Sequence, residues 1–353
     1  MDSGNDRRLV NADNLRNFCA RLFQSVGVPQ DEAVVNADNL VDADLKGVES
    51  HGVTRAPIYL KRLRMGLVRP AVSLEVISEM PSAALVDVKN SMGAAASEKV
   101  MRMAIAKAKQ TGISFITVRN SNHFSAAAYF AQMALSEDMI GLAGSNGPAR
   151  MAPWGGSKPM FGTDPFAVAI PAGKRLPVIA DMASCVVARG KIIIAAKNGK
   201  PIPLGWARDK DGNDTTDAKA ALEGTVVPFG GPKGYAIATI IEALTGVLAG
   251  SRFGTAINDI YSDFEHPTYT SHYLGAIKVA AFGPVEQFKS QMDEFIDGIK
   301  SSTRAKGVEE IFLPGEIELR RKEQRLREGI PLSGSTLGDL KTASEACGVP
   351  FDI

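Results

Sequence analysis

Two histidines lie in polar motifs whose residue types suit acid–base chemistry on a small carboxylate. The first motif combines Ser50, His51, Arg55 and Tyr59. If this segment is helical, the guanidinium of Arg55 lies one turn from His51 and can take a carboxylate with two parallel hydrogen bonds beside the imidazole. The alternative interpretation is a surface turn followed by a solvated arginine. The motif alone does not decide between the two.

The second histidine, His123, lies in the run NSNHF, directly after an apolar run at 113–118 that predicts a strand. Enzymes with α/β folds place reactive groups where strands end. An imidazole titrates near neutral pH and can give or take the proton that accompanies hydride transfer at a carbonyl. The same position also suits a histidine that only hydrogen-bonds to polar loop residues.

Four further segments offer backbone N–H groups or a cation to a phosphate or ribose. They are Ser145-Asn146-Gly147, Gly162-Thr163-Asp164-Pro165, Asp181-Met182-Ala183-Ser184 and Gly231-Pro232-Lys233-Gly234. Such turns are also common where no ligand binds, and neither G-x-G-x-x-G nor G-x-x-x-x-G-K-[ST] is present. No H-E-x-x-H or C-x-x-C pattern occurs, so we expect no metal requirement. The residues by themselves predict an α/β enzyme of undefined chemistry.

The elements that would position these residues alternate between helix and strand in the middle of the chain. Helical spacing of apolar residues predicts two helices over 11–44 and a third after Ser50, with His51, Arg55 and Tyr59 on one face. The apolar run 234–250 predicts a buried helix. The remaining predictions are strands at 83–88, 113–118, 140–143, 166–170 and 177–181, and helices at 92–109, 126–135, 285–301, 317–328 and 337–347.

This pattern predicts an α/β fold in two domains, which 353 residues permit. We expect a mainly helical domain from 1–80 and 285–353, and an α/β domain from 81–284. The net charge of +1, from 40 basic and 39 acidic residues, disfavours nucleic acid or an anionic membrane as a partner. The sequence shows no apolar signal region, no membrane span and no disulfide framework among its three cysteines. We therefore expect a cytoplasmic protein.

Several long motifs, taken in order, resemble the malate/L-lactate dehydrogenase family, which is distinct from the Rossmann-type lactate and malate dehydrogenases. The matching stretches, within 15–337, are GVESHGVTRAPIYLKRLRMG, VRNSNHF, GTDPFAVAIP, DMASCVVARGKI and GPKGYAIATIIEALTGVLAG. Ser125 and Ala236 stand where the family usually has glycine. The resemblance implies a non-Rossmann α/β fold with a mixed sheet, NAD or NADP as cofactor, and a small carboxylate substrate. It also implies a homodimer with the site at the subunit interface.

The resemblance further implies roles for individual residues. His123 corresponds to the acid–base catalyst, His51 and Arg55 orient the substrate, and Ser50 and Tyr59 make supporting contacts. The implied reaction moves a hydride between the cofactor and carbon 2 of a 2-keto or 2-hydroxy acid. Two alternatives stay open: a reductase of cyclic imino acids such as Δ1-piperideine-2-carboxylate, and a non-catalytic ligand-binding protein. The positions that match cofactor contacts are Ser145, Thr163, Asp181, Met182, Ala183 and Lys233.

Overall fold

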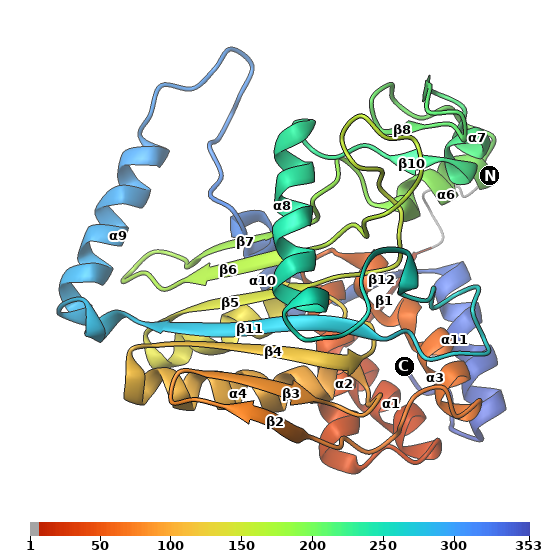
Figure 1. Ribbon diagram of the computed structural model, residues 1–353, viewed down its shortest axis with the longest axis horizontal. Coiled ribbons are helices and arrows are strands. Elements are labelled where there is room, and N and C mark those ends of the chain that lie inside the picture. The colour runs from red at the N-terminus through yellow and green to blue at the C-terminus, as the bar shows by residue number, and fades with distance from the viewer. Residues whose placement is uncertain (1–6) are drawn as a thin grey trace.

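The computed structural model describes residues 7–353 and is built around a mixed seven-stranded sheet (Figure 1). The strand order is β2-β3-β4-β11-β5-β6-β7, and only β3 and β4 pair in parallel. The expected α/β class is confirmed. The strands span Glu75–Glu79 (β2), Ala83–Asp87 (β3), Ile113–Ser121 (β4), Met139–Ser145 (β5), Phe166–Ile170 (β6), Val178–Met182 (β7) and Thr270–Lys278 (β11).

Strand β11 joins the two halves of the sheet, although it comes from late in the chain. It lies antiparallel between β4 and β5, with Leu274 opposite both Ile116 and Ala143. These three side chains are fully buried in one core with helices α4 (Gly93–Thr111) and α5 (Ala127–Ala131). On the other face, Thr117 of β4 donates a 3.0 Å hydrogen bond to the carbonyl of Leu244. Helices therefore flank the sheet on both faces.

The segment that contains Leu244 differs from the buried helix predicted over 234–250. It consists of helix α8 (Pro232–Glu242) and a π-helical turn, η4 (Ala243–Val247). Ile240, Val247 and Leu248 are each more than half exposed, at 57%, 57% and 55%. The prediction that this run is buried is therefore wrong in the single chain, because only one side of α8 and η4 packs on the sheet. No helix within residues 7–353 combines the length and apolar character needed to cross a membrane.

A layer of helices from the two ends of the chain packs around a second core (Figure 1). Helices α1 (Ala12–Ser25), α2 (Gln30–Leu45), α3 (Ala56–Arg64) and α11 (Gly334–Cys347) share this core, and α10 (Glu316–Glu328) packs on α2. A short antiparallel pair, β1 (Arg7–Val10) and β12 (Ile330–Ser333), joins the two ends of the chain. This layer carries the segment from Ser50 to Tyr59.

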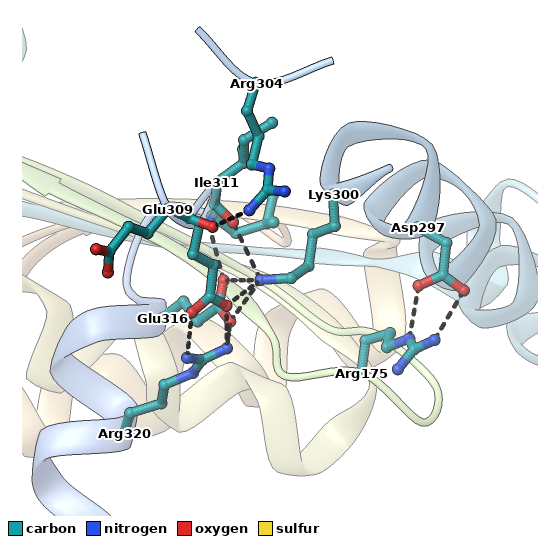
Figure 2. A network of polar contacts seen from close by, with 10 residues as sticks. Arg175, Asp297, Lys300, Arg304, Glu309, Ile311, Glu316 and Arg320 are labelled. Carbon is teal, nitrogen blue, oxygen red and sulfur yellow. Dashed lines mark hydrogen bonds and ion pairs between the residues drawn. The ribbon is translucent and has the colours of Figure 1, made fainter. Parts of the chain in front are cut away.

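Helix α9 (Val285–Lys300) lies apart from this layer, beside the turn between β6 and β7 (Figure 1). The carboxylate of Asp293 accepts hydrogen bonds from the backbone N–H groups of residues 173–175. Figure 2 shows how charged residues fasten α9 and α10: Asp297 pairs with Arg175, and Lys300 and Arg320 both pair with Glu316.

A small lobe between β7 and α8 has a core of its own. Its three short strands, β8 (Ala207–Arg208), β9 (Asp214–Thr215) and β10 (Thr225–Val226), pair in the order β10-β8-β9. Helices α6 (Arg189–Lys197) and α7 (Ala218–Glu223) complete it. Strands of two residues carry no readable periodicity, so the sequence did not predict this lobe.

One end of the main sheet collects the ends of five neighbouring strands. Strands β4, β5 and β7 end there, at Ser121, Ser145 and Met182, while β11 and β6 begin there. The register places Thr270 opposite Ser121 and Phe166 opposite Met182. The polar motifs follow or precede these ends in the sequence, so the topology brings them to one edge of the molecule.

Candidate active site

The segment from Ser50 to Arg55 bends tightly and is not one continuous helix. Two single 3-10 turns, Glu49–His51 (η1) and Val53–Arg55 (η2), precede α3, and Gly52 between them has extended backbone. The prediction of one helix that carries both His51 and Arg55 is therefore wrong. The reason is close packing, because a Cβ atom on Gly52 would lie 1.9 Å from Oδ1 of Asp44.

The bent segment nevertheless meets the loop after β4 and brings the two histidines together. The rings of His51 and His123 are stacked, with their centroids 5.6 Å apart. The hydroxyl of Tyr59 lies 2.5 Å from Nδ1 of His123, and the backbone N–H of Ser125 donates to the same nitrogen over 3.3 Å. Which nitrogen of the neutral ring carries the proton depends on the direction of the Tyr59 hydroxyl. Both contacts use Nδ1, and no group within residues 7–353 hydrogen-bonds to Nε2. That atom remains for a substrate.

The local structure explains how Ser125 fits a position where the resemblance predicts glycine. Its backbone is left-handed, with φ of 67°, a conformation that favours glycine. Its hydroxyl donates a 2.7 Å hydrogen bond to the carbonyl of His51, in addition to the N–H bond with His123. These two contacts offset the backbone strain and tie the two histidine segments to each other.

The guanidinium of Arg55 lies at the same place and has no acidic partner within residues 7–353. Its Nε donates to the backbone carbonyl of Ser50 over 2.6 Å, and its Nη1 donates to the hydroxyl of Tyr261. The hydroxyl of Ser50 lies 2.9 Å from Nδ1 of His51. The remaining Nη hydrogens of Arg55 are therefore free to bind an anion.

Burial and positive charge keep both histidines neutral at pH 7. Burial, with a further contribution from Arg55, lowers the pKa of His51 to about 4. Burial also lowers the pKa of His123 well below 6.5, and Arg55, His51 and His272 act in the same direction. The pKa of Tyr59 is raised by burial, so its hydroxyl keeps its proton. An anion bound to Arg55 would weaken the positive charge that acts on both rings.

His272 on β11 connects this cluster to the end of β5. Its Nδ1 lies 2.9 Å from the hydroxyl of Ser145, and its Nε2 lies 2.9 Å from the hydroxyl of Ser121. The ring stacks on Phe124, the neighbour of His123, with centroids 4.2 Å apart. It is fully buried, and burial lowers its pKa to about 3. Sequence reasoning missed this residue because its position depends on pairing between distant strands.

The loops expected to contact a cofactor meet beside the histidine cluster. The carbonyl of Thr163 accepts from the N–H and the hydroxyl of Ser184, over 2.8 and 2.9 Å. Gly234, in the first turn of α8, packs so closely on Ser184 that a Cβ atom would lie 2.5 Å from its carbonyl oxygen. The N-cap of α8, Gly231, offers no side-chain acceptor, and the neighbouring Lys233 is exposed. The N–H groups of Gly231, Lys233 and Gly234 already donate to the carbonyls of Pro228, Gly230 and Phe229, so the exposed Lys233 ammonium is the group that this turn offers to a phosphate.

The other expected cofactor residues have different surroundings. The carboxylate of Asp181 accepts a 2.8 Å hydrogen bond from the N–H of Ala128 at the start of α5, and so connects β7 to that helix. Met182 is 44% exposed, and Ala183 is half-buried beside it. The hydroxyl of Ser145 is already engaged by the buried histidine on β11. Met182, Ala183 and the exposed Asp181 are therefore accessible to a ligand, whereas the hydroxyl of the buried Ser145 serves a neighbouring strand.

Comparison with known proteins places these observations in a family context. The family model described as malate/L-lactate dehydrogenase matches residues 10–341. The L-sulfolactate dehydrogenase of Methanocaldococcus jannaschii is 38% identical over 344 residues, which cover 98% of each chain. The solved structure of malate dehydrogenase from Pyrococcus horikoshii superposes with a TM-score of 0.90 at 35% identity over 99% of each chain. That of delta1-piperideine-2-carboxylate reductase from Pseudomonas syringae has a TM-score of 0.85 at 27% identity, over 95% of this chain and 99% of that one.

Asp44 hydrogen-bonds to the bent segment, and its burial leads to a prediction about stability. Its Oδ2 accepts a 2.8 Å hydrogen bond from the N–H of Val53, and the residue is buried. Burial is the main cause that raises its pKa from 3.8 to about 7; Glu49 adds to the rise, while the Val53 N–H and Arg325 oppose it. Between these two pKa values the folded protein binds more protons than the unfolded chain, so this contribution to stability is lost as pH rises through 7.

We therefore predict that Asp44→Asn gains stability relative to the wild type as pH rises from 5 to 8. Asparagine keeps an acceptor for the Val53 N–H and has no charge to bury. Urea unfolding at both pH values measures the effect, which should reach up to about 3 kcal/mol in the difference between the two proteins. An identical pH dependence for both proteins would contradict the raised pKa.

Proposed function

Because the chain belongs to the malate/L-lactate dehydrogenase family, it is an NAD(P)-dependent oxidoreductase of 2-hydroxy acids, and we propose that the cluster of His51, His123 and Arg55 is its catalytic centre. One observation carries this proposal. The ring of His123 is held through Nδ1 by Tyr59 and Ser125, which leaves Nε2 as the reactive atom beside a guanidinium without an acidic partner.

In the proposed mechanism, the substrate carboxylate binds the free Nη donors of Arg55 and the C2 oxygen faces Nε2 of His123. The neutral ring of His51 lies alongside as a second hydrogen-bonding group, held by Ser50. When bound, the nicotinamide cofactor supplies a hydride to C2 or accepts one from it. His123 gives a proton to the C2 oxygen during reduction and takes it back during oxidation.

Tyr59 supports both protonation states of His123. Its hydroxyl can donate to an unprotonated Nδ1 or accept from a protonated one, since a hydroxyl is both donor and acceptor. The imidazolium therefore donates from Nδ1 to Tyr59 while Nε2 delivers its proton. The neutral ring left after delivery carries its proton on Nδ1, still donates to Tyr59, and has an unprotonated Nε2 that can take the proton back. Burial of Tyr59 favours the neutral phenol throughout.

The cofactor is NAD or NADP, since relatives are named for dependence on each. We assign its binding to the α/β domain, residues 81–284, at the sheet end where the strand termini meet, with the helical domain of 1–80 and 285–353 supplying the substrate arginine. The exposed Lys233 in the first turn of α8 supports a phosphate position there. Thr163, Met182 and Ala183 contact the bound cofactor, while Ser145 and Asp181 shape the site through their neighbours.

The reaction itself generates the most direct prediction. We expect the protein to oxidise NADH or NADPH with one of a panel of 2-keto acids that includes pyruvate, oxaloacetate and sulfopyruvate. His123→Ala should lower kcat/KM by about 10²- to 10⁴-fold, because no other group replaces the proton donor. Absorbance at the reduced-nicotinamide band follows the reaction. Turnover that survives the substitution would contradict this role for His123.

Two comparisons make that result specific. The exposed His266, which hydrogen-bonds to Asp263, provides the matched control, and His266→Ala should leave kcat/KM within about twofold. Δ1-piperideine-2-carboxylate belongs in the same panel, because that cyclic imine also carries a carboxylate next to a reducible carbon. Turnover of the imine alone would favour an imine reductase. No turnover with either cofactor would favour a ligand-binding protein.

The environment of His123 generates a prediction about pH. Its pKa lies well below 6.5 in the free protein, and kcat/KM reports on the free enzyme. For oxidation of a 2-hydroxy acid, which needs the neutral base, kcat/KM should rise with a midpoint below pH 6.5 and then level off. For reduction, which needs the protonated acid, it should fall through the same midpoint as pH rises. An oxidation midpoint above about pH 7.5 would contradict the neutral state assigned to His123.

A homodimer is the proposed assembly. Four apolar side chains on α8, on η4 and just beyond are at least half exposed; they are Ile240, Val247, Leu248 and Phe253. Light scattering should give a mass of twice 37.5 kDa. Leu248→Glu should shift the protein toward the single-chain mass by burying a charge at the contact, whereas Leu326→Glu, on the exposed side of α10, should not. A monomeric wild type would refute the assembly.

A further inference from the structure

We propose that Tyr261 is a positioning residue for Arg55 and a determinant of carboxylate binding, an inference that rests on the function proposed above. Tyr261 belongs to no motif and lies in the loop between η5 (Gly254–Ala256) and β11. Its hydroxyl is nevertheless the only side-chain group within residues 7–353 that hydrogen-bonds to the guanidinium of Arg55. The guanidinium carbon lies 5.3 Å from the centroid of the Tyr261 ring.

The two contacts of Arg55 restrict how it can bind a carboxylate. Its Nε is used by the Ser50 carbonyl, which blocks side-on binding through the Nε and Nη2 edge. The Tyr261 hydroxyl takes one hydrogen of Nη1, so the second hydrogen of Nη1 and both hydrogens of Nη2 remain for a substrate. Ser50 and Tyr261 together therefore fix the plane in which Arg55 presents these hydrogens.

The loop that carries Tyr261 is ordered by a carboxylate. Oδ1 of Asp259 accepts from the N–H of Tyr261 over 2.6 Å and from the N–H of Ser262 over 3.2 Å. The other side of the same carboxylate pairs with Arg150, in the segment that follows β5. Asp259 thus sets the local turn and attaches it to the sheet end where the cofactor residues lie.

Helix α3 holds the same loop from the opposite side. Arg62 is almost fully buried, and its guanidinium donates to the carbonyls of Ile260, Asp263 and His266 over 3.3, 2.6 and 2.8 Å. Lys61 lies 3.6 Å from the ring centroid of Phe264. Because α3 begins directly after Arg55, one rigid helix places both the arginine and the loop whose tyrosine contacts it.

Tyr261 itself contributes little to the core, since it is 52% exposed. A half-exposed phenol on a loop with this much anchoring is typical of a binding residue and not of a packing residue. Its hydroxyl lies beside the position proposed for the substrate carboxylate. Loss of the hydroxyl should therefore leave the fold intact and release the guanidinium from its fixed direction.

The test is Tyr261→Phe, which keeps the ring over Arg55 and removes only the hydroxyl. We expect KM for the 2-keto acid turned over by the wild type to rise about five- to tenfold, with kcat changed less than about threefold. The dissociation constant of oxamate, a non-reacting carboxylate probe, from the complex with reduced cofactor should rise by the same factor. The dissociation constant of the reduced cofactor alone and the thermal midpoint should be unchanged.

Tyr269→Phe is the matched control, because this tyrosine lies in the same loop with its ring 3.7 Å from the guanidinium carbon of Arg252. It should behave as the wild type. A double-mutant cycle with Arg55→Lys then tests the route of the effect: in the Arg55→Lys background, Tyr261→Phe should add less than about twofold to KM, since both changes act on one contact.

Unchanged KM and oxamate affinity in Tyr261→Phe, in an active wild type, would overturn the inference and leave the proposed function standing. Fully multiplicative effects of the two substitutions would also overturn it, because Tyr261 would then act independently of Arg55. An inactive wild type, or full activity in His123→Ala, would instead refute the proposed function. In that case, loss of oxamate binding in Tyr261→Phe would still report a carboxylate site at Arg55.

Discussion

The pairing of β11 with β4 on one side and β5 on the other is the interaction on which the rest of the structure depends. Through this pairing, a strand that comes more than a hundred residues after its partners in the sequence connects the two halves of the sheet. It also inserts His272 between Ser121 and Ser145, which fixes the loop of His123 relative to the cofactor edge. The five strands from β4 to β7 in the sheet pair only antiparallel, so the ends of β4, β5 and β7 lie beside the beginnings of β11 and β6 at one edge.

Electrostatics at that edge follow from burial more than from opposite charges. His51, His123 and His272 all have pKa values lowered chiefly by burial, and the one cation beside them, Arg55, lowers those of His51 and His123 further. The neutral histidines do not compensate the charge of Arg55, so its guanidinium has no counterion until an anion binds. Binding of a carboxylate then compensates Arg55 and favours protonation of His123, so substrate binding and readiness for proton transfer are coupled.

Local patterns predicted the long elements well. The two helices over 11–44 and the helices at 92–109, 285–301, 317–328 and 337–347 all lie close to their expected bounds. Prediction failed where tertiary contact overrides local preference. Gly52 breaks the expected helix because Asp44 packs against it, and hydropathy could not tell that the outer side of α8 faces away from the core. The proximity of His51 and His123 followed from resemblance to a family and not from spacing. Nothing in the sequence marked Tyr261, whose position depends on a buried arginine in another element.

A crystal structure of the protein with reduced cofactor and oxamate would show whether a carboxylate binds Arg55 with its C2 oxygen at His123. We expect the oxamate carboxylate on the Nη hydrogens of Arg55 and the amide oxygen within hydrogen-bond distance of Nε2 of His123. Oxamate bound at another place, with Nε2 of His123 facing only protein atoms, would contradict both the carboxylate site at Arg55 and the role of His123 as proton donor.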